Sequence, residues 1–415
     1  MIGTIVKKEI TANLLSYKFF VVILLASVLI FTSLFVMARD YKARLADYQV
    51  NKPAVGDATA FLPPNPLSIV AKGLDESMAR SFGVNVTGFD IQSGQKSGNI
   101  VYAFFPAPDF VYVVKLVMSL VALLFGFDQI SREKENGTLK MILSNSASRS
   151  SLLTGKWIGN FLSLAVPFTL VTLLGIAVTG LDPAIRLSAG QIGRLALVIG
   201  LSLVYIALFL SLGLLVSALT QRSASSLVVL LLLWAGLVFI LPNLGTLLAR
   251  QIVNVPSTKA LSEKRQQIWT SEILSAYSGN GGWDGRIWNE RKTAMNREFD
   301  RLEEDYRRQA DRLVRLSKTI NRISPAAGFI YAATDIAGTG IGEDSRLKQD
   351  VIRYKNQILP DLVREKRPYP AFRYQYRPVG QVLAEGALID IAWLLAAVIL
   401  VFGTGAAAMK RYDVR

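Results

Sequence analysis

Ionisable residues at the edges of apolar segments are the first candidates for chemistry in this chain. Lys115, Asp128 and Asp390 each lie where a hydrophobic run begins or ends. A charge inside a membrane is costly, and it often serves a substrate pathway, a proton relay or a subunit interface. Long side chains near the end of a span can also extend to the membrane surface. We therefore treat these three residues as candidate pathway or interface residues.

Composition excludes most other site chemistry. The 415 residues include no histidine and no cysteine, which removes Ser-His-Asp and Cys-His catalysis, imidazole and thiolate metal sites, and disulfides. Gly155-Lys156 resembles the end of a phosphate-binding loop. That loop needs a glycine where this chain has Ser150 and a Ser or Thr where it has Trp157. We predict no catalytic residue, no metal site and no cofactor bound by this chain itself.

The composition indicates a membrane protein. Hydrophobic residues make up 51% of the chain. Charged residues make up 19%, below the ~25% that is usual in soluble domains. The formal net charge of +15 favours an anionic partner. Because the chain is so apolar, membrane lipid is the expected anionic partner.

Six charge-poor runs approach the ~20 residues that cross a bilayer. We predict spans at 19–38, 110–128, 157–181, 195–219, 227–248 and 387–409. The first run is longer than the ~7–15 residues of a signal-peptide core, so we interpret it as a retained span. Residues 1–18 have the apolar spacing of a helix that lies in the membrane interface. The predicted fold class is an all-α polytopic membrane protein with six transmembrane helices.

Lysine and arginine near the span ends predict the orientation, because short cytoplasmic loops are enriched in both. The N-terminal segment, the 129–156 loop, the turn at Arg222 and the 410–415 tail all carry such residues. The short loop 182–194 contains Arg186 and Arg194. We expect both termini on the cytoplasmic side of the membrane. Segments 39–109 and 249–386 would then be extracytoplasmic.

The two outer segments have different patterns. Segment 39–109 is rich in Pro and Gly and is expected to form a small irregular or mixed domain with a short helix near 68–82. Segment 249–386 should contain a coiled-coil-like helix at about 288–323, ~50 Å long, whose apolar seam needs a partner. The seam consists of Met295, Phe299, Leu302, Tyr306, Leu313, Leu316 and Ile320.

The other faces of this long helix carry many charges. A nucleic-acid surface is one interpretation, but acidic residues such as Glu303 and Glu304 are interleaved with the arginines. Interleaved signs are typical of a solvated helix with i,i+4 pairs. We therefore predict no nucleic-acid partner.

The loop between the second and third spans, 129–156, has the most informative pattern. It predicts a polar hairpin of short helices with an exposed face of Leu139, Ile142 and Leu143. Gly137 lies between the two helices, and basic residues hold the loop near the membrane. Such a projection fits a groove on another protein, although an ordinary solvated loop is the alternative.

The same loop resembles the Glu-x-x-x-Gly-Thr-Leu, Ser-Arg and Gly-Lys signature of ABC-2-type transporter permeases. The resemblance implies a coupling helix that docks on a separate cytoplasmic ATPase, which would bind ATP and Mg. It also implies an elbow helix that includes Lys8 and Glu9, and a second permease, identical or related. The implied docking residues are Arg132, Glu133, Glu135, Gly137, Thr138, Leu139, Leu143, Arg149, Gly155 and Lys156.

Further motifs resemble the permeases of multicopper-enzyme maturation and gliding motility. They are Pro66-Leu67-Ser68 with Gly73-Leu74-Asp75, residues 324–326 with residues 337–340, and residues 411–415. One position departs from the family pattern, since Ala147 stands where a proline is frequent. That departure affects the expected turn of the loop rather than its role.

The sequence thus predicts the membrane-spanning subunit of an ATP-driven ABC transporter. ATP hydrolysis by the separate ATPase would drive export or the rearrangement of extracytoplasmic partners. A non-transporting scaffold or signalling protein, whose outer helix recruits a partner, is the first alternative. An ion-coupled secondary transporter that uses Lys115, Asp128 or Asp390 is the second.

Overall fold

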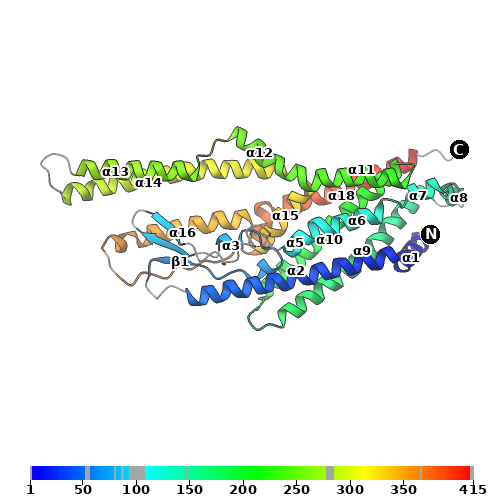
Figure 1. Ribbon diagram of the computed structural model, residues 1–415, viewed down its shortest axis with the longest axis horizontal. Helices are drawn as coiled ribbons and strands as arrows, with labels where there is room; N and C mark the ends of the chain where they lie inside the picture. The colour runs from blue at the N-terminus through cyan, green and yellow to red at the C-terminus, as the bar shows by residue number, and fades with distance from the viewer. Residues whose placement is uncertain are drawn as a thin grey trace.

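The computed structural model describes residues 2–51, 57–78, 81–85, 88–92, 108–144, 148–276, 285–364 and 367–411. The molecule is elongated and its helices run mostly along the long axis (Figure 1). Among the described residues, six helices are long and apolar enough to cross a membrane. This confirms the predicted all-α polytopic class.

Three spans are single helices and three are built from several pieces. The single ones are α2 (Tyr17–Val50), α9 (Arg149–Gly180) and α10 (Ala189–Leu219). In each of the others a five-residue π-helical turn lies within the rod. The second span is α5 (Phe110–Val113), η2 (Val114–Met118) and α6 (Ser119–Gly126). The fifth is α11 (Ser223–Ala235), η3 (Gly236–Ile240) and α12 (Leu241–Ile252), and the sixth is α17 (Val379–Val382), η4 (Leu383–Ala387) and α18 (Leu388–Arg411).

The first span extends well past its apolar part. The apolar run of the first span ends near Ala38, whereas helix α2 continues to Val50. The extension is supported by polar contacts, including an i,i+4 ion pair of 3.0 Å between Arg44 Nε and Asp40 Oδ2. The length of the apolar run therefore predicts where the chain crosses the membrane, but it does not predict where the helix ends.

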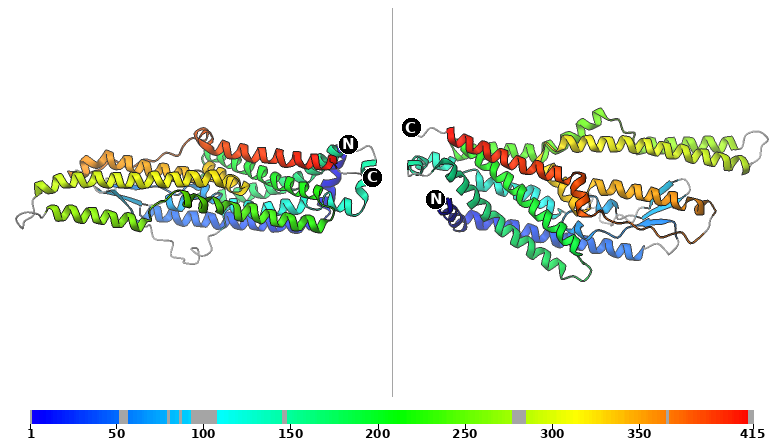
Figure 2. Two further views of the ribbon diagram at one scale, coloured as in Figure 1. Left: turned by 90° about the horizontal axis from the view of Figure 1, so that it is seen from above. Right: turned by 180° about the vertical axis from the view of Figure 1, so that it is seen from behind.

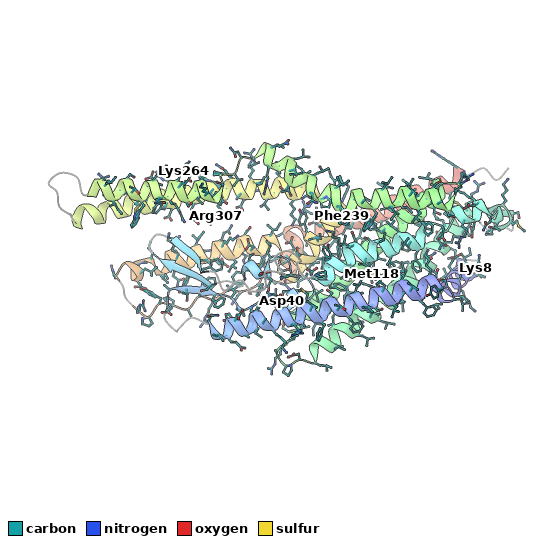
Figure 3. All side chains as sticks on the ribbon, viewed as in Figure 1. Lys8, Asp40, Met118, Phe239, Lys264 and Arg307 are labelled. Carbon is teal, nitrogen blue, oxygen red and sulfur yellow. The ribbon has the colours of Figure 1, made fainter. Side chains whose placement is uncertain are left out.

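The two ends of the bundle differ in character. At one end, the elbow end, lie the short helices α1 (Ile2–Leu14), α7 (Ser131–Glu135) and α8 (Thr138–Ser144) (Figure 1). Lys8 marks this end in Figure 3. At the other end, the sheet end, lie the strands, α16 (Ile341–Val363) and a long helical hairpin.

The core of the bundle surrounds α10, which packs against α6, α15 (Pro325–Ala337) and α18. Helix α15 is buried among the spans, and its Phe329 ring stacks on Tyr205 with centroids 4.4 Å apart. It also contacts all three π-helical turns, η2, η3 and η4. Helix α15 therefore joins the second, fifth and sixth spans at the sheet end.

The two outer segments combine into one small domain. Strands β1 (Thr59–Phe61), β2 (Ser81–Asn85) and β3 (Gly88–Gln92) form an antiparallel sheet in the order β1-β2-β3. Phe82 packs with Leu347 and Val351 of α16. The sequence did not predict this pairing, because the two segments are more than 200 residues apart.

The prediction of one short helix near 68–82 was wrong. A 3₁₀ turn, η1 (Pro66–Ile69), and one helical turn, α3 (Asp75–Met78), occupy part of this range, and β2 begins at Ser81. Gly73 separates the two turns with φ +47°, and a Cβ there would lie 2.4 Å from the carbonyl oxygen of Thr339. The backbone turns at this glycine, so a continuous helix is impossible.

The long predicted helix forms a hairpin with its own neighbours. Helices α13 (Thr258–Ala276) and α12 both pack against α14 (Gly285–Asn321). Met295 is fully buried and Phe299 is almost so. Figure 2 shows from two directions that the α13–α14 hairpin projects along the long axis at the sheet end. The partner that the apolar seam requires is therefore supplied within this chain.

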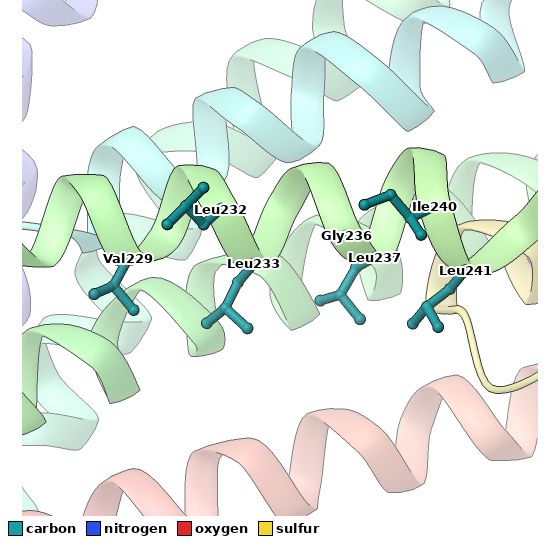
Figure 4. A pocket seen from close by; sticks show the side chains of 7 residues that line it. All are labelled: Val229, Leu232, Leu233, Gly236, Leu237, Ile240 and Leu241. Atoms are coloured by element: carbon teal, nitrogen blue, oxygen red, sulfur yellow. The ribbon is translucent and has the colours of Figure 1, made fainter.

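The fifth span is the least enclosed of the six in this chain. An apolar hollow of about 420 Å³ follows one stripe of α11, η3 and α12 (Figure 4). It is lined by Val229, Leu232, Leu233, Gly236, Leu237, Ile240 and Leu241. An apolar stripe in a membrane-spanning helix suits lipid chains or another helix.

Candidate functional site

Lys156 is the centre of a buried charge cluster at the elbow end. Its side chain is 4% exposed, near the start of α9. Its Nζ lies 2.8 Å from Glu133 Oε1 of α7 and 3.2 Å from Glu9 Oε1 of α1. Three residues that the sequence selected separately thus meet in one cluster. A buried ammonium between two carboxylates links the three elements rigidly, because separating them would strand charges in an apolar interior.

The elbow helix approaches α9 closely because two glycines line the contact. A Cβ on Gly155 would lie 2.7 Å from Ile5 Cγ2, and a Cβ on Gly159 would lie 2.6 Å from Glu9 Cβ. Glycines four residues apart form the small-xxx-small surface that lets helices pack tightly. Gly155 therefore serves helix packing, whereas Gly159 was missed although its spacing from Gly155 is visible in the sequence.

Amide side chains form a hydrogen-bond network next to the Lys156 cluster, one helical turn further along α9. Asn160 Oδ1 accepts hydrogen bonds from Asn13 Nδ2 at 2.9 Å and from Gln129 Nε2 at 3.2 Å. Asn160 Nδ2 donates to the Lys156 carbonyl oxygen at 2.8 Å. These amides join α1, the end of the second span and α9. Sequence reasoning missed them, although an asparagine within an apolar run is itself a signal.

Helix α7 also holds the fourth and fifth spans. Lys134 Nζ donates to the carbonyl oxygens of Ala218 and Thr220, at the end of α10. Glu135 Oε2 accepts the backbone N–H of Ser223, at the start of α11, at 3.1 Å. One helix of five residues is thus bonded directly to α9, α10 and α11, and it is linked to α1 through Lys156. A displacement of α7 would therefore act on all four helices.

Helix α8 follows α7 after a turn at Gly137, whose φ is +70°. Thr138, Lys140 and Met141 of α8 are exposed, and Met141 is 70% exposed. The predicted exposure of Leu139 was wrong. Leu139 is fully buried and packs with Leu152 and Leu153, because its own chain offers an apolar surface beside it.

The remaining residues of the predicted docking set lie around these two helices. Leu143 is half-buried against the same cluster as Leu139, and Arg132 is exposed. Arg149 Nη1 donates to the Lys410 carbonyl oxygen, which ties the start of α9 to the end of α18. Lys8 is exposed on α1, whereas its neighbour Glu9 is buried. The exposed surface of the loop is therefore polar, with Met141 as its main apolar group.

Comparison with known proteins gives the family of this chain. The family model described as "ABC-2 family transporter protein" matches residues 3–412. The chain belongs to the ABC-2 transporter family. Among curated proteins, the probable ABC transporter permease protein NosY of Stutzerimonas stutzeri is 30% identical over 116 residues, 28% of this chain and 41% of the relative. NosY of Pseudomonas aeruginosa is 34% identical over 115 residues, 26% of this chain and 40% of the relative.

This chain thus spans about two fifths of the length of the two NosY relatives. Family membership makes it a transporter permease subunit and a membrane protein. Permeases of ABC transporters in general work with a cytoplasmic ABC ATPase.

A second charge cluster lies at the sheet end of this ABC-2 permease. Asp390 of α18 is fully buried, and its Oδ1 lies 2.6 Å from Arg322 Nε. Lys318 Nζ lies 3.9 Å from Asp390 Oδ2 and 2.7 Å from Asp335 Oδ2. We call these four residues the latch cluster. It joins the end of α14 to α15 and to the sixth span.

The sheet domain has its own attachment to the sixth span. Arg377 Nε donates to the buried Glu343 Oε2 at 2.7 Å, and its Nη1 pairs with Glu385 of η4. Tyr374 donates its hydroxyl hydrogen to Glu343 Oε1 at 2.7 Å. Burial, together with this hydrogen bond, raises the pKa of Tyr374, so the hydroxyl remains a donor at physiological pH. The sheet domain and the hairpin therefore hold the sixth span on either side of Gly386, where φ is +153°.

The three ionisable pathway candidates do not form one site. Asp128 lies at the elbow end, 3.5 Å from Arg132 Nη2, whereas Asp390 lies beside η4. Lys115 is in η2, with its Nζ over the Tyr112 ring at 5.5 Å from the centroid. Tyr205 donates its hydroxyl hydrogen to the Lys115 carbonyl oxygen at 3.2 Å. Among the described residues, no hydrogen bond or ion pair connects any two of these three side chains.

Proposed function

We propose that this permease couples ATP hydrolysis by a separate cytoplasmic ATPase, which binds the ATP and Mg, to export or to rearrangement of its extracytoplasmic parts. The observation that supports this proposal is that α7 is bonded to α9, α10 and α11 and is linked to α1 through Lys156. It is followed directly by α8, on which Thr138, Lys140 and Met141 are exposed to solvent. A displacement of α8 would therefore be transmitted to several spans at once.

The elbow end is proposed to face the cytoplasm of a bacterial inner membrane. Lysines gather there, with Lys7 and Lys8 exposed on α1, Lys140 exposed on α8 and Lys410 exposed at the end of α18. Basic residues beside short loops remain preferentially on the cytoplasmic side. This orientation places the sheet domain and the hairpin outside, where they could meet an extracytoplasmic partner.

The proposed mechanism is a shift between two packed arrangements of the spans. Closure of the ATPase pushes α8, and α7 passes the movement to α9 through Glu133 and Lys156. The contact between Arg149 and the Lys410 carbonyl carries it into α18. At the far end of the sixth span, Asp390 transfers it to the hairpin through Arg322. Direct contacts between helices thereby connect the elbow end of the permease to its sheet end.

A second permease copy, or a related permease, is proposed to complete the membrane assembly. The apolar hollow on the fifth span supports this proposal, since Leu232 and Ile240, which line it, are largely exposed in the described part of the chain. Lipid chains would cover the part of the stripe that no second permease reaches.

The test is co-purification with the ATPase encoded beside this permease. The permease is expressed with that neighbour, purified in detergent and weighed by native mass spectrometry. We expect two permeases with two ATPases. Lys140→Glu, on exposed α8, should reduce the bound ATPase about tenfold, because a like charge would face the docking partner. Lys7→Glu, an equal charge reversal on α1, is the matched control.

Other results would favour the alternatives. A chain that never holds an ATPase, and holds only an outer protein, would support the scaffold hypothesis, which the projecting hairpin favours. Transport driven by an ion gradient without ATP would support a secondary transporter. That alternative is weakened because both oxygens of Asp390 are engaged by Arg322.

A further inference from the structure

The second span does not continue straight into α7. Helix α6 ends at Gly126, residues 127–130 form a turn, and α7 begins at Ser131. The first N–H groups of a helix have no acceptor within that helix. Ile130, which precedes α7, has no polar side chain that could accept them, and both Ile130 and Ser131 are fully buried. Their backbone N–H groups therefore need an acceptor from another part of the chain.

Ser217 of the fourth span supplies this acceptor. Its Oγ accepts the backbone N–H of Ile130 and that of Ser131, each at 2.9 Å. The Ser217 hydroxyl donates its own hydrogen to Ser131 Oγ at 3.2 Å, and Ser131 Oγ donates to the Phe127 carbonyl oxygen at 3.0 Å. The start of α7 is therefore capped by a serine of a different helix.

Two glycines bring this serine close enough to the turn. A Cβ on Gly126 would lie 2.8 Å from Gly213 Cα, and a Cβ on Gly213 would lie 2.9 Å from Gly126 Cα. The backbones of α6 and α10 are therefore in direct contact at this point. Gly213 lies four residues before Ser217, on the same face of α10. Because the backbones approach so closely, the short side chain of Ser217 reaches the amides that follow α6.

Helix α10 is a firm support for the turn. It is the most enclosed of the six spans in this chain, and it contains neither a proline nor a π-helical turn. Arg194 holds its other end, since the buried guanidinium donates to the Ile336 carbonyl oxygen at 2.9 Å and to the Arg377 carbonyl oxygen. Ser217 thus belongs to a straight helix that is fastened at both ends.

Ser217 differs from another buried serine of the same helix. Ser202 Oγ donates to the Val198 carbonyl oxygen at 2.8 Å, four residues earlier on α10. Such a bond within one helix is the usual arrangement for a helical serine. The Ser217 hydroxyl is instead directed at the start of α7. Ser202 therefore provides an internal comparison for a hydroxyl that serves only its own helix.

We propose that Ser217 is a positioning residue for α7 and α8. It holds the bend after α6 and so sets the direction in which these two helices leave the bundle. This direction keeps Glu133 of α7 in contact with Lys156. The role of Ser217 in coupling rests on the proposed function, in which α8 meets the ATPase. Its role in holding the bend does not.

The first experiment measures the position of α8 in the full permease without the ATPase. Spin labels are placed at Met141→Cys on α8 and at Ile192→Cys near the start of α10, where the side chains are 70% and 55% exposed. Ser217→Ala leaves two buried N–H groups without their acceptor, so the distance distribution should become about twice as wide. Ser217→Thr keeps the hydroxyl and should restore the original width. Ser202→Ala, the matched control, should leave it unchanged.

Hydrogen exchange tests the same contact and also decides the case if Ser217→Ala does not fold. In the unsubstituted permease, the amides of Ile130 and Ser131 should exchange about a hundredfold more slowly than in an unstructured peptide, because both are buried and bonded. In Ser217→Ala they should exchange about tenfold faster than in the unsubstituted permease.

Co-purification extends the test to coupling. Ser217→Ala should retain about fivefold less ATPase than the unsubstituted permease, since α8 is no longer held in one direction. Ser217→Thr and Ser202→Ala should retain the normal amount. If the unsubstituted permease never holds an ATPase, the proposed function fails, whereas the distance and exchange measurements still decide whether Ser217 holds the bend.

Three outcomes would overturn the proposal. One is an unchanged distance distribution in Ser217→Ala. A second is equal broadening in Ser217→Ala and Ser202→Ala, which would indicate general loosening of α10. The third is rapid exchange of the Ile130 and Ser131 amides in the unsubstituted permease, which would mean that the cap does not hold.

Discussion

Lys156 and Glu133 form a buried ion pair of 2.8 Å between α9 and α7, with side chains 4% and 14% exposed. Glu9 shares the same ammonium at 3.2 Å, so two carboxylates compete for one cation. Glu133 Oε2 is buried and has no hydrogen-bond partner among the residues that the structure describes. Glu133 therefore has one carboxylate oxygen that is not hydrogen-bonded, which makes its pairing with Lys156 the contact to test first.

The first prediction compares removal of the shared cation, Lys156, with removal of the charge on one of its partners, Glu133. Lys156→Met leaves two buried carboxylates facing each other, so it should lower the free energy of unfolding by about 3–5 kcal/mol. Glu133→Gln retains the Lys156–Glu9 pair and should cost about 1 kcal/mol. Thermal unfolding in detergent measures both. Equal losses in the two variants would show that Glu133, rather than the shared ammonium, dominates the cluster.

Glu133→Gln also tests the coupling path. With the ATPase bound, we expect a normal amount of ATPase in the complex but a transport rate per ATP reduced about tenfold, because α7 no longer pulls on Lys156. Glu263→Gln makes the same change at a side chain that is 59% exposed on α13, far from the docking loop, so it is the matched control and should leave the ratio unchanged. A normal ratio in Glu133→Gln would remove the pair from the mechanism.

The second prediction concerns the packing of the elbow helix. Gly159→Leu should destabilise the protein by about 1–3 kcal/mol, since its Cβ would lie 2.6 Å from Glu9 Cβ and the helices would separate. Gly200→Leu is the control, because a Cβ on that exposed glycine of α10 meets no atom within 4 Å. Melting temperature reports the difference. Similar melting of both variants would argue against close packing of α1 on α9.

Hydropathy predicted the spans because membrane-crossing length depends on local composition alone. Motifs identified Glu9, Glu133 and Lys156 as candidate site residues. The contact between them was not predictable from the sequence, since 123 residues separate Glu9 from Glu133. Leu139 was judged exposed because a short loop sequence does not show the surface it packs against. Similarly, α13 was not identified as the partner of the Met295 seam, because residues 258–276 lack a clear apolar period.

The third prediction isolates the backbone turn between α7 and α8. Gly137 has φ +70°, yet a Cβ there would meet nothing within 4 Å, so any effect of substitution is conformational. Gly137→Val should reduce ATPase binding by about fivefold, since a β-branched residue disfavours the left-handed region by ~1 kcal/mol or more. Gly137→Asn tolerates that region and should bind normally. Pull-down with the labelled ATPase measures both, and equal loss in both variants would point to the side chain instead.

The fourth prediction concerns the latch cluster. Asp390→Asn removes the charge shared by Arg322 and Lys318. We expect a loss of about 2–3 kcal/mol of stability, less than for a fully buried pair because both cations are partly exposed. The hairpin should also become more mobile, since its attachment to the sixth span is weakened. Asp47→Asn, on exposed α2, is the charge-matched control.

Spin labels can measure the position of the hairpin directly, because the chain has no cysteine of its own. With labels at Thr270→Cys on α13 and Arg353→Cys on α16, the distance distribution should shift when ATP hydrolysis is trapped. In Asp390→Asn the shift should disappear while the ATPase remains bound. A shift that persists in Asp390→Asn would mean that movement reaches the hairpin by another route, such as Lys355 and Asp300, which are 3.1 Å apart between α16 and α14.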